Sequence, residues 1–382
     1  MHVPTSTPAN QPSANGQLPE SVIVIGAGPV GLMIALKLAT AGIAVDVIEK
    51  NTKLSHQPRA VGYHGAALAA LKRTPVYEEA IKLGFFGKGI CWRKPLIEDG
   101  EGGMKMGEII ASLPFPSNEE TGDGHGNSVL YLPQPQLAQL FYKAALQTAW
   151  NTGGKLETFE GAFLVGADGG KSATRKILNI PFKGHSWPER IVAIDAGKKT
   201  LYRCSVAVDP NDTRTDEELV SESNLMLLLN ILAPGPRPLD LRILNASAYR
   251  THQLCASTMR RGRCLLAGDA AHLNNPFGAL GLTTGLLDAD ALADALDMII
   301  NEKKSIDLLD IYSDERRRVF QNFVDPMSSQ NKLRCANEPE TATEDWLLRA
   351  MIKKTPEIIE AFGRPFFDFW PTDMRKLVAS RG

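Results

Sequence analysis

The sequence predicts an α/β fold, because three stretches of the chain share one pattern of apolar strand, glycine-containing turn and helix. These stretches are residues 22–50, 161–176 and 263–300. Strands that alternate with helices are typical of a parallel sheet with helices on its faces. Residues 183–257 instead alternate apolar and polar positions between Pro and Gly breaks, which predicts an antiparallel sheet. We therefore expect a Rossmann-like domain interleaved with a smaller, mostly antiparallel β domain, followed by C-terminal helices.

The first stretch contains the most informative motif and reads VIVIGAGPVGLMIALKLATAGIAVDVIEK. Val22–Ile25 predicts a buried parallel strand, and the GxGxxG motif that follows consists of Gly26, Gly28 and Gly31. In such a motif the first glycine permits a tight turn and the second lets a pyrophosphate approach the backbone. The third glycine allows the helix to pack closely on the strand.

The rest of this stretch completes a βαβ unit. A helix from about Pro29 to Ala41 would direct its free N–H groups and positive dipole end at the pyrophosphate. Ala44–Ile48 predicts the second strand, and Glu49 ends it about 20 residues after the middle glycine, where a carboxylate can accept hydrogen bonds from a ribose diol. This context favours a dinucleotide site over a glycine turn that only packs, and it leaves NAD and FAD open.

Composition limits the other classes of function. The 382 residues are 43% hydrophobic and 22% charged, which is ordinary for a globular chain longer than one typical domain. A net charge of −1 argues against a nucleic-acid surface, and no apolar run approaches the ~18 residues of a membrane span. Five cysteines without a CxxC pair predict a reducing, cytoplasmic compartment and no metal site. Residues 1–19 predict a disordered leader rather than a signal peptide.

Local patterns predict further elements. An amphipathic helix of about three turns follows Gly65, and another begins near Gln134 and runs to about residue 150. The apolar run Leu225–Ala233 predicts a strand. Residues 305–382 predict surface-facing helices, and the charged run Asp314–Arg318 predicts a solvated, ion-paired helix face.

Three motifs in this order resemble those of the class A flavoprotein monooxygenases, the aromatic hydroxylases typified by p-hydroxybenzoate hydroxylase and phenol hydroxylase. They are GxGxxG with Glu49, then GADGGKSATR, then GDAAHxxxPxGxxG, and the resemblance extends from about residue 20 to 320. It implies a GR2-type FAD-binding domain over residues 20–90, 131–182 and 258–320. It also implies a substrate domain over residues 91–130 and 183–257, followed by a C-terminal helical segment over 321–382.

The resemblance implies a set of residues that hold the cofactor, taken here from the adenosine end to the flavin ring. These are Glu49 at the ribose, Gly26, Gly28 and Gly31 at the pyrophosphate, Arg59 and Gln134 at the phosphate and ribityl region, Asp168 in the motif that serves FAD and the nicotinamide, Asp269 at the ribityl chain, and Pro276, Gly281 and Leu282 beside the ring. The residues identify no general base, and His272 is expected to be structural.

The implied function is an FAD-dependent monooxygenase that consumes NAD(P)H and O₂. It would hydroxylate or epoxidise a small phenolic or polyketide-like aromatic molecule through a flavin hydroperoxide, with a homodimer left open. One alternative is another FAD oxidoreductase on the same scaffold, although the tryptophans lack the W-x-W-x-I-P string of flavin halogenases. The other is a trimmed, inactive flavoprotein, because residues 151–162 have room for a hairpin at most.

The flavin loop departs from the family pattern in two places. Ala279 stands where relatives often have Gly, and Thr283 stands where they often have Asn. We expect Ala279 to add a methyl group near the ring and Thr283 to offer a hydroxyl in place of an amide. The helix after this loop is expected to open near Gly285, with its positive end toward the flavin.

Overall fold

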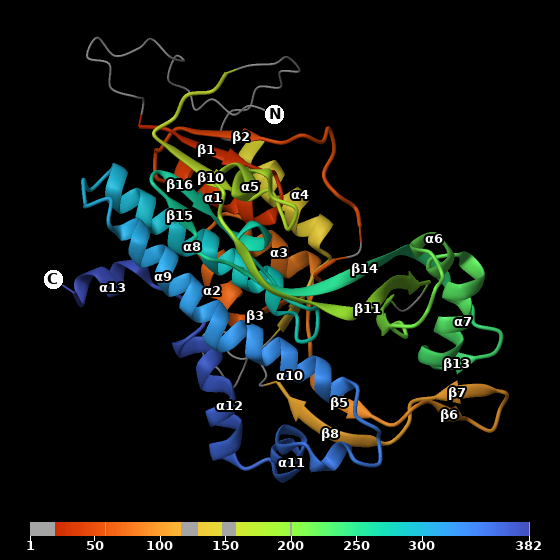
Figure 1. The fold of residues 1–382 in the computed structure, drawn as a ribbon. Coiled ribbons are helices and arrows are strands. Elements are labelled where there is room, and N and C mark those ends of the chain that lie inside the picture. The colour runs from red at the N-terminus through yellow and green to blue at the C-terminus, as the bar shows by residue number, and fades with distance from the viewer. Residues whose placement is uncertain (1–19, 58, 116–128, 147–157, 199–200, 382) are drawn as a thin grey trace.

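A computed structural model describes residues 20–57, 59–115, 129–146, 158–198 and 201–381 (Figure 1). The predicted leader, residues 1–19, and most of the short 151–162 segment lie outside the described residues. The α/β fold class is confirmed, and the domain limits stay predictions.

The central sheet is built from the three stretches that share the strand–turn–helix pattern. Its order is β15-β16-β10-β1-β2, in which β1, β2, β10 and β16 run parallel and β15 is an antiparallel edge strand. Val22 on β1 lies opposite Val45 on β2 and Phe163 on β10, and all three side chains are buried. The strands are β1 (Val22–Ile25), β2 (Val45–Ile48), β10 (Phe163–Gly166), β15 (Arg260–Arg261) and β16 (Cys264–Leu266).

Helices cover this sheet. The longest, α8, is buried along most of its length and packs on α1. It begins at Leu280 rather than near Gly285, so its N-terminal end lies more than a turn earlier than predicted. The α2 helix, expected to have three turns, has eight residues. These helices are α1 (Pro29–Thr40), α2 (Gly65–Lys72), α3 (Tyr77–Leu83), α4 (Gln134–Leu146), α5 (Ala173–Ile177) and α8 (Leu280–Ile300).

A second sheet, ordered β12-β11-β14-β17, is antiparallel as predicted. Figure 1 shows β11 and β14 extending from the parallel sheet toward α6 and α7. The prediction of a strand over Leu225–Ala233 is wrong, because this run lies in α7. Leu225 and Leu229, one helical turn apart, are its buried face. The elements are β11 (Phe182–Gly197), β12 (Leu201–Ala207), β14 (Arg242–Ala256), β17 (His272–Leu273), α6 (Asp216–Leu219) and α7 (Glu222–Leu232).

Short strands connect these parts. One small sheet, β3-β9-β4, lies beside the flavin loop, and the two-stranded sheet β5-β8 packs on α11 through β8. The strands are β3 (Gly62–His64), β4 (Phe85–Phe86), β5 (Gly89–Arg93), β6 (Ile97–Glu98), β7 (Gly103–Lys105), β8 (Ile109–Pro114), β9 (Val129–Tyr131) and β13 (Gly235–Pro236).

The C-terminal region is helical, but it is not simply surface-facing. A long helix passes through a π segment, residues 320–324, just before Pro326, whose missing N–H removes an α-helical hydrogen bond. Trp370 and Arg316 are fully buried, so the solvated face predicted for Asp314–Arg318 is wrong at Arg316. The elements are α9 (Leu308–Val319), η2 (Phe320–Val324), α10 (Asp325–Cys335), α11 (Trp346–Lys353), α12 (Pro356–Asp368) and α13 (Met374–Ala379).

Candidate functional site

The first glycine turn, residues 26–31, and the second, residues 166–170, pack against each other with their backbones in contact. A methyl group placed on Gly26, whose φ is +109°, would lie 2.5 Å from the carbonyl oxygen of Ala167. A methyl group on Gly31 would lie 2.0 Å from the carbonyl oxygen of Gly26 and 3.3 Å from Cβ of Ala167. Both glycines are therefore required for packing.

The third turn, residues 268–272, contacts the other two. The buried Arg175 donates hydrogen bonds from Nη1 to the carbonyl of Ala270 at 2.8 Å and from Nη2 to the carbonyl of Gly170 at 2.9 Å. A methyl group on Gly268 would lie 3.0 Å from Cγ2 of Val30, in the first turn of α1. The three turns, far apart in sequence, thus form one continuous site.

Gly28 differs from its neighbours because its α-carbon faces open space. No atom would lie within 4 Å of a methyl group placed there, and its φ of −72° suits any residue. Gly28 is also the N-cap of α1, with no side chain bonded to the first N–H groups of the helix. Free N–H groups beside an open surface are what a pyrophosphate requires. The residues present therefore fit a dinucleotide phosphate.

Glu49 lies at the end of β2, as predicted, and it already has protein partners. Its Oε2 accepts a hydrogen bond from the backbone of Ala27 at 2.9 Å, and its Oε1 accepts two from Asn51 at 2.8 and 2.9 Å. A carboxylate has about four acceptor positions, so a ribose hydroxyl would use the remaining capacity.

Asp168 is used by its own motif. Its carboxylate accepts hydrogen bonds from the Ser172 hydroxyl at 2.5 Å and from the backbone N–H groups of Ala173 and Thr174 at 2.8 and 3.0 Å. Ser172 in turn caps α5 by accepting from Arg175 N. Asp168 therefore shapes the second turn and directs Arg175 toward the third.

Arg59, Gln134 and Asp269 come together from different elements. The backbone N–H of Gln134 donates to the carbonyl of Ala60 at 3.0 Å, which places the start of α4 beside Arg59. Burial raises the pKa of Asp269, and the positive charges of Arg59 and His272 offset that rise only in part. A carboxyl group in this position is well suited to accept hydrogen bonds from a polyol once a ligand covers it.

The predicted flavin loop continues into a helix: residues 274–279 form the loop, and Thr283 lies in the first turn of α8. Pro276 is exposed, while Gly281 and Leu282 lie half-buried in the first turn of α8. A methyl group on Gly281 would lie 3.1 Å from Oδ1 of Asn274, so the loop folds back over the helix start.

A buried charged cluster supports the third turn, and the sequence did not reveal it. Asp288 on α8 accepts hydrogen bonds from His272 Nε2 at 2.6 Å, Arg316 Nε at 2.7 Å and the backbone N–H of Gly268 at 3.0 Å. This contact supports the structural role expected for His272, which stays a prediction. The available signal was an acidic residue within the apolar stripe of the helix after Gly285.

The antiparallel sheet faces the same site. Arg203 pairs with Asp195 and donates from Nη1 to the carbonyl of Arg59. Asn245 donates to the carbonyl of His56 at 2.5 Å. Asn245 lies opposite Asp195, so one face of β11 and β14 is turned toward the loop that carries His56 and Arg59.

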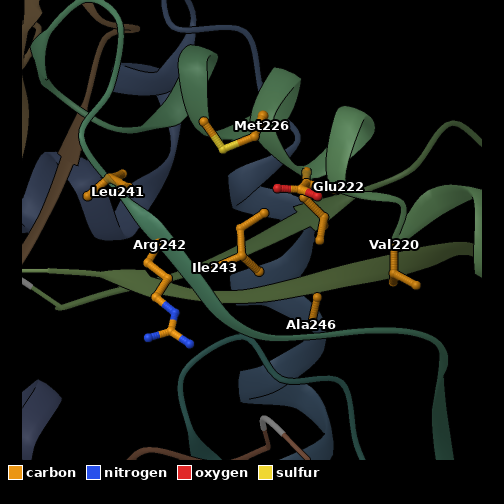
Figure 2. A pocket seen from close by; sticks show the side chains of 8 residues that line it. Val220, Glu222, Met226, Leu241, Arg242, Ile243 and Ala246 are labelled. Atoms are coloured by element: carbon orange, nitrogen blue, oxygen red, sulfur yellow. The ribbon is translucent and has the colours of Figure 1, made fainter.

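A separate hollow lies on the opposite face of this sheet, against α7 (Figure 2). It is lined by six apolar residues together with Glu222 and Arg242; the apolar residues are Val220, Leu225, Met226, Leu241, Ile243 and Ala246. Ala246 follows Asn245 directly, and successive strand residues face opposite ways, so this hollow is distinct from the three-turn site.

Two features are absent from the described residues. No helix in the described part of the chain is long and apolar enough to cross a membrane. Within the same ranges no cluster of His, Cys, Asp and Glu side chains has the arrangement of a metal site.

Comparison with known proteins places this geometry in a family. The FAD binding domain family matches residues 20–153 and 188–326. Para-nitrophenol 4-monooxygenase of Pseudomonas sp. (strain WBC-3) is 31% identical over 350 residues, covering 82% of this chain and 86% of that protein. The 6-hydroxy-3-succinoylpyridine 3-monooxygenase HspB of Pseudomonas putida (strain DSM 28022 / S16) is 30% identical over 376 residues, covering 86% and 92%.

A solved structure agrees over almost the full chain. The crystal structure of p-nitrophenol 4-monooxygenase PnpA from Pseudomonas putida DLL-E4 superposes with a TM-score of 0.73 and 28% identity, covering 95% of this chain and 97% of that one. The chain belongs to the FAD binding domain family of class A aromatic monooxygenases. It is an FAD-dependent monooxygenase, and NAD(P)H is the usual co-substrate of this family.

Proposed function

We propose that this enzyme hydroxylates a small phenolic or related aromatic molecule, using NAD(P)H and O₂. The observation that supports this most strongly is the meeting of three turns at one site, with one face of an antiparallel sheet turned toward the loop that carries Arg59. Bound FAD supplies the redox chemistry, which carries electrons from the nicotinamide to O₂ and one oxygen atom to the substrate. The chain supplies binding, orientation and exclusion of water.

The proposed cofactor contacts follow the line from the first turn to the third. Asp168 contributes indirectly in this proposal, because its oxygens cap α5. The direct contacts are Glu49 with the adenosine ribose, Gly28 and the N–H groups of α1 with the pyrophosphate, Arg59 and Gln134 with the phosphate and ribityl region, Asp269 with the ribityl chain, and Pro276, Gly281 and Leu282 with the ring.

The sheet face turned toward the Arg59 loop is proposed to contact the substrate. Side chains alternate along a strand, so Ser247 and Tyr249 share the face of Asn245, and Ala193 lies opposite Ser247. Burial raises the pKa of Tyr249, although the charges of Arg203 and Arg59 lower it in part, so its phenol stays neutral. Small side chains beside a neutral phenol, with Arg203 already paired, favour an aromatic ring with a hydroxyl group over a strongly charged ligand.

Substrate screening tests this proposal. Purified protein should be yellow and should oxidise NADH or NADPH faster when a suitable phenol is added, 4-nitrophenol being the first choice. With ¹⁸O₂, mass spectrometry should show a product that contains one oxygen atom from O₂, either added at a ring C–H position or placed on the nitro-bearing carbon with release of nitrite; the second oxygen atom leaves as water. A colourless protein that takes up no FAD would overturn the proposal.

The alternative, that the chain is an inactive flavoprotein, predicts a different result in the same assay. An inactive flavoprotein would bind FAD and gain stability from it, yet would form no oxygenated product with any phenol. The predicted homodimer and cytoplasmic location also stay proposals. The five unpaired cysteines support a reducing compartment, and light scattering of the FAD-loaded enzyme measures the assembly state.

A further inference from the structure

The flavin loop contains two consecutive left-handed residues directly before α8. Gly278 has φ +98°, and Ala279 has φ +57° and serves as the N-cap of α8. Glycine adopts this conformation freely, whereas alanine does so at an energetic cost. Contacts outside the loop must therefore hold Ala279 in place.

Elements on three sides provide these contacts. His64 on β3 meets the Gly278 carbonyl with Nε2 at 2.8 Å. Gln253 on β14 accepts hydrogen bonds from the backbone and side chain of Asn275 at 2.7 and 3.1 Å. Asn331 on α10 covers Gly278 so closely that a methyl group there would lie 2.6 Å from its Nδ2.

His64 is the contact that reaches both the loop and the helix. Besides the Gly278 carbonyl, its backbone N–H points to the Thr283 hydroxyl at 3.4 Å, in the first turn of α8. Thr283 is fully buried. One residue of β3 thus contacts both the left-handed segment and the first turn of α8.

The protonation of His64 follows from its partner. A carbonyl oxygen only accepts hydrogen bonds, so Nε2 must carry the proton. Burial lowers the pKa of His64, and its bond to Gly278 offsets this in part, which favours the neutral ring. The rings of Phe366 and Trp370, each with its centroid 5.3 Å away, fix the orientation of the imidazole.

We propose that His64 is a positioning residue that holds the flavin loop in its conformation and thereby fixes the position of the first turn of α8. The proposal rests on the placement of the flavin ring beside Gly281 and Leu282 given above. The free N–H groups of that turn form the positive end of a 21-residue helix. A loosened loop would move them away from the ring, which weakens FAD binding and lowers the stabilisation of negative charge on the reduced ring.

Hydrogen exchange followed by mass spectrometry, carried out on the FAD-free protein, tests whether His64 holds the loop. His64→Phe keeps an aromatic ring but removes the donor, so amides of residues 278–284 should exchange roughly three- to tenfold faster. His64→Gln, whose amide can donate to the same carbonyl, should restore most of the protection. His185→Phe, at an exposed position of β11, is the matched control and should match the wild type. Unchanged exchange rates in His64→Phe would overturn the proposed role of His64.

Two measurements on the FAD-loaded protein test the consequence. His64→Phe should raise the FAD dissociation constant about tenfold and lower the flavin midpoint potential, and His64→Gln should reverse both. Faster exchange with wild-type affinity and potential would overturn the claim that the loop positions the ring. If His64→Phe does not fold, His64→Asn, whose amide is too short to reach Gly278, replaces it. None of these results depends on turnover of a phenol, so they are separate from a failed substrate screen.

Discussion

Gly28 and Gly31 belong to the same turn and have opposite surroundings. The α-carbon of Gly28 faces open space, while a methyl group on Gly31 would lie 2.0 Å from a backbone oxygen. In the proposed site Gly28 is therefore needed by the ligand, whereas Gly31 is needed by the fold. This difference separates binding from stability within four residues.

We predict that Gly28→Ala leaves the free energy of unfolding of the FAD-free protein within about 0.5 kcal/mol of the wild type. Its added methyl group occupies the space of the pyrophosphate, so the FAD dissociation constant should rise roughly tenfold or more. Gly31→Ala is the contrasting variant and should lose about 1–3 kcal/mol of stability. Urea unfolding and FAD titration measure both effects. Wild-type FAD affinity in Gly28→Ala would contradict the placement of the phosphate.

For single residues, the sequence predicted features that depend on local backbone conformation. It missed features that depend on partners that only the fold brings together. The GxGxxG spacing was readable because turn and phosphate contact both require glycine locally. The partners of Glu49 and the burial of Arg316 were not readable. Arg316 looked solvated in a run of charges because its partner, Asp288, lies on another helix.

The α8 helix links the third turn to the C-terminal region through one carboxylate. Asp288 is fully buried, and Arg316, which bonds it, also donates to the Trp370 carbonyl at 2.7 Å. Burial alone would raise the pKa of Asp288, but the charges and hydrogen bonds of His272 and Arg316 outweigh it, so the pKa lies below its ordinary value.

Asp288→Asn should destabilise the folded chain by about 3–5 kcal/mol, because it leaves buried cationic groups without their carboxylate. Lys303→Ala, which breaks an exposed pair with Glu20, is the control and should cost less than about 1 kcal/mol. Urea unfolding of the two variants measures the difference. A cost for Asp288→Asn as small as that of the control would contradict the role of the cluster.

The same carboxylate predicts a pH dependence. A group whose pKa is lower in the folded state stabilises that state above about pH 4, and the contribution is lost as pH falls through the folded-state value. Between pH 6 and pH 3 the wild type should therefore lose more stability than Asp288→Asn does. Equal losses would show that Asp288 does not contribute through its charge.

Among the elements, long periodic helices and the buried parallel strands were predictable, whereas α7 was not. Its run LMLLLNIL is apolar on every side, so periodicity does not separate strand from helix. In the fold, Leu225 and Leu229 are buried, while Leu227 and Ile231 are 59% and 61% exposed. Tertiary packing against β11 and β14 decides the outcome.

At the scale of the whole molecule, three turns that lie far apart in the sequence are joined by direct contacts. Ala167 meets Gly26, Arg175 bonds Ala270, and Gly268 packs on Val30. The sequence predicted this meeting through the order of the motifs. It could not predict the contacts that the C-terminal helices make with the flavin loop, because no motif records which helix covers which turn.

An experimental structure of the FAD complex tests the central claim most directly. The account predicts one extended FAD, with its adenosine ribose near Glu49, its pyrophosphate against Gly28, its ribityl chain at Asp269 and its ring beside Gly281. Density for FAD anywhere else, or a ribityl chain remote from Asp269, would contradict it.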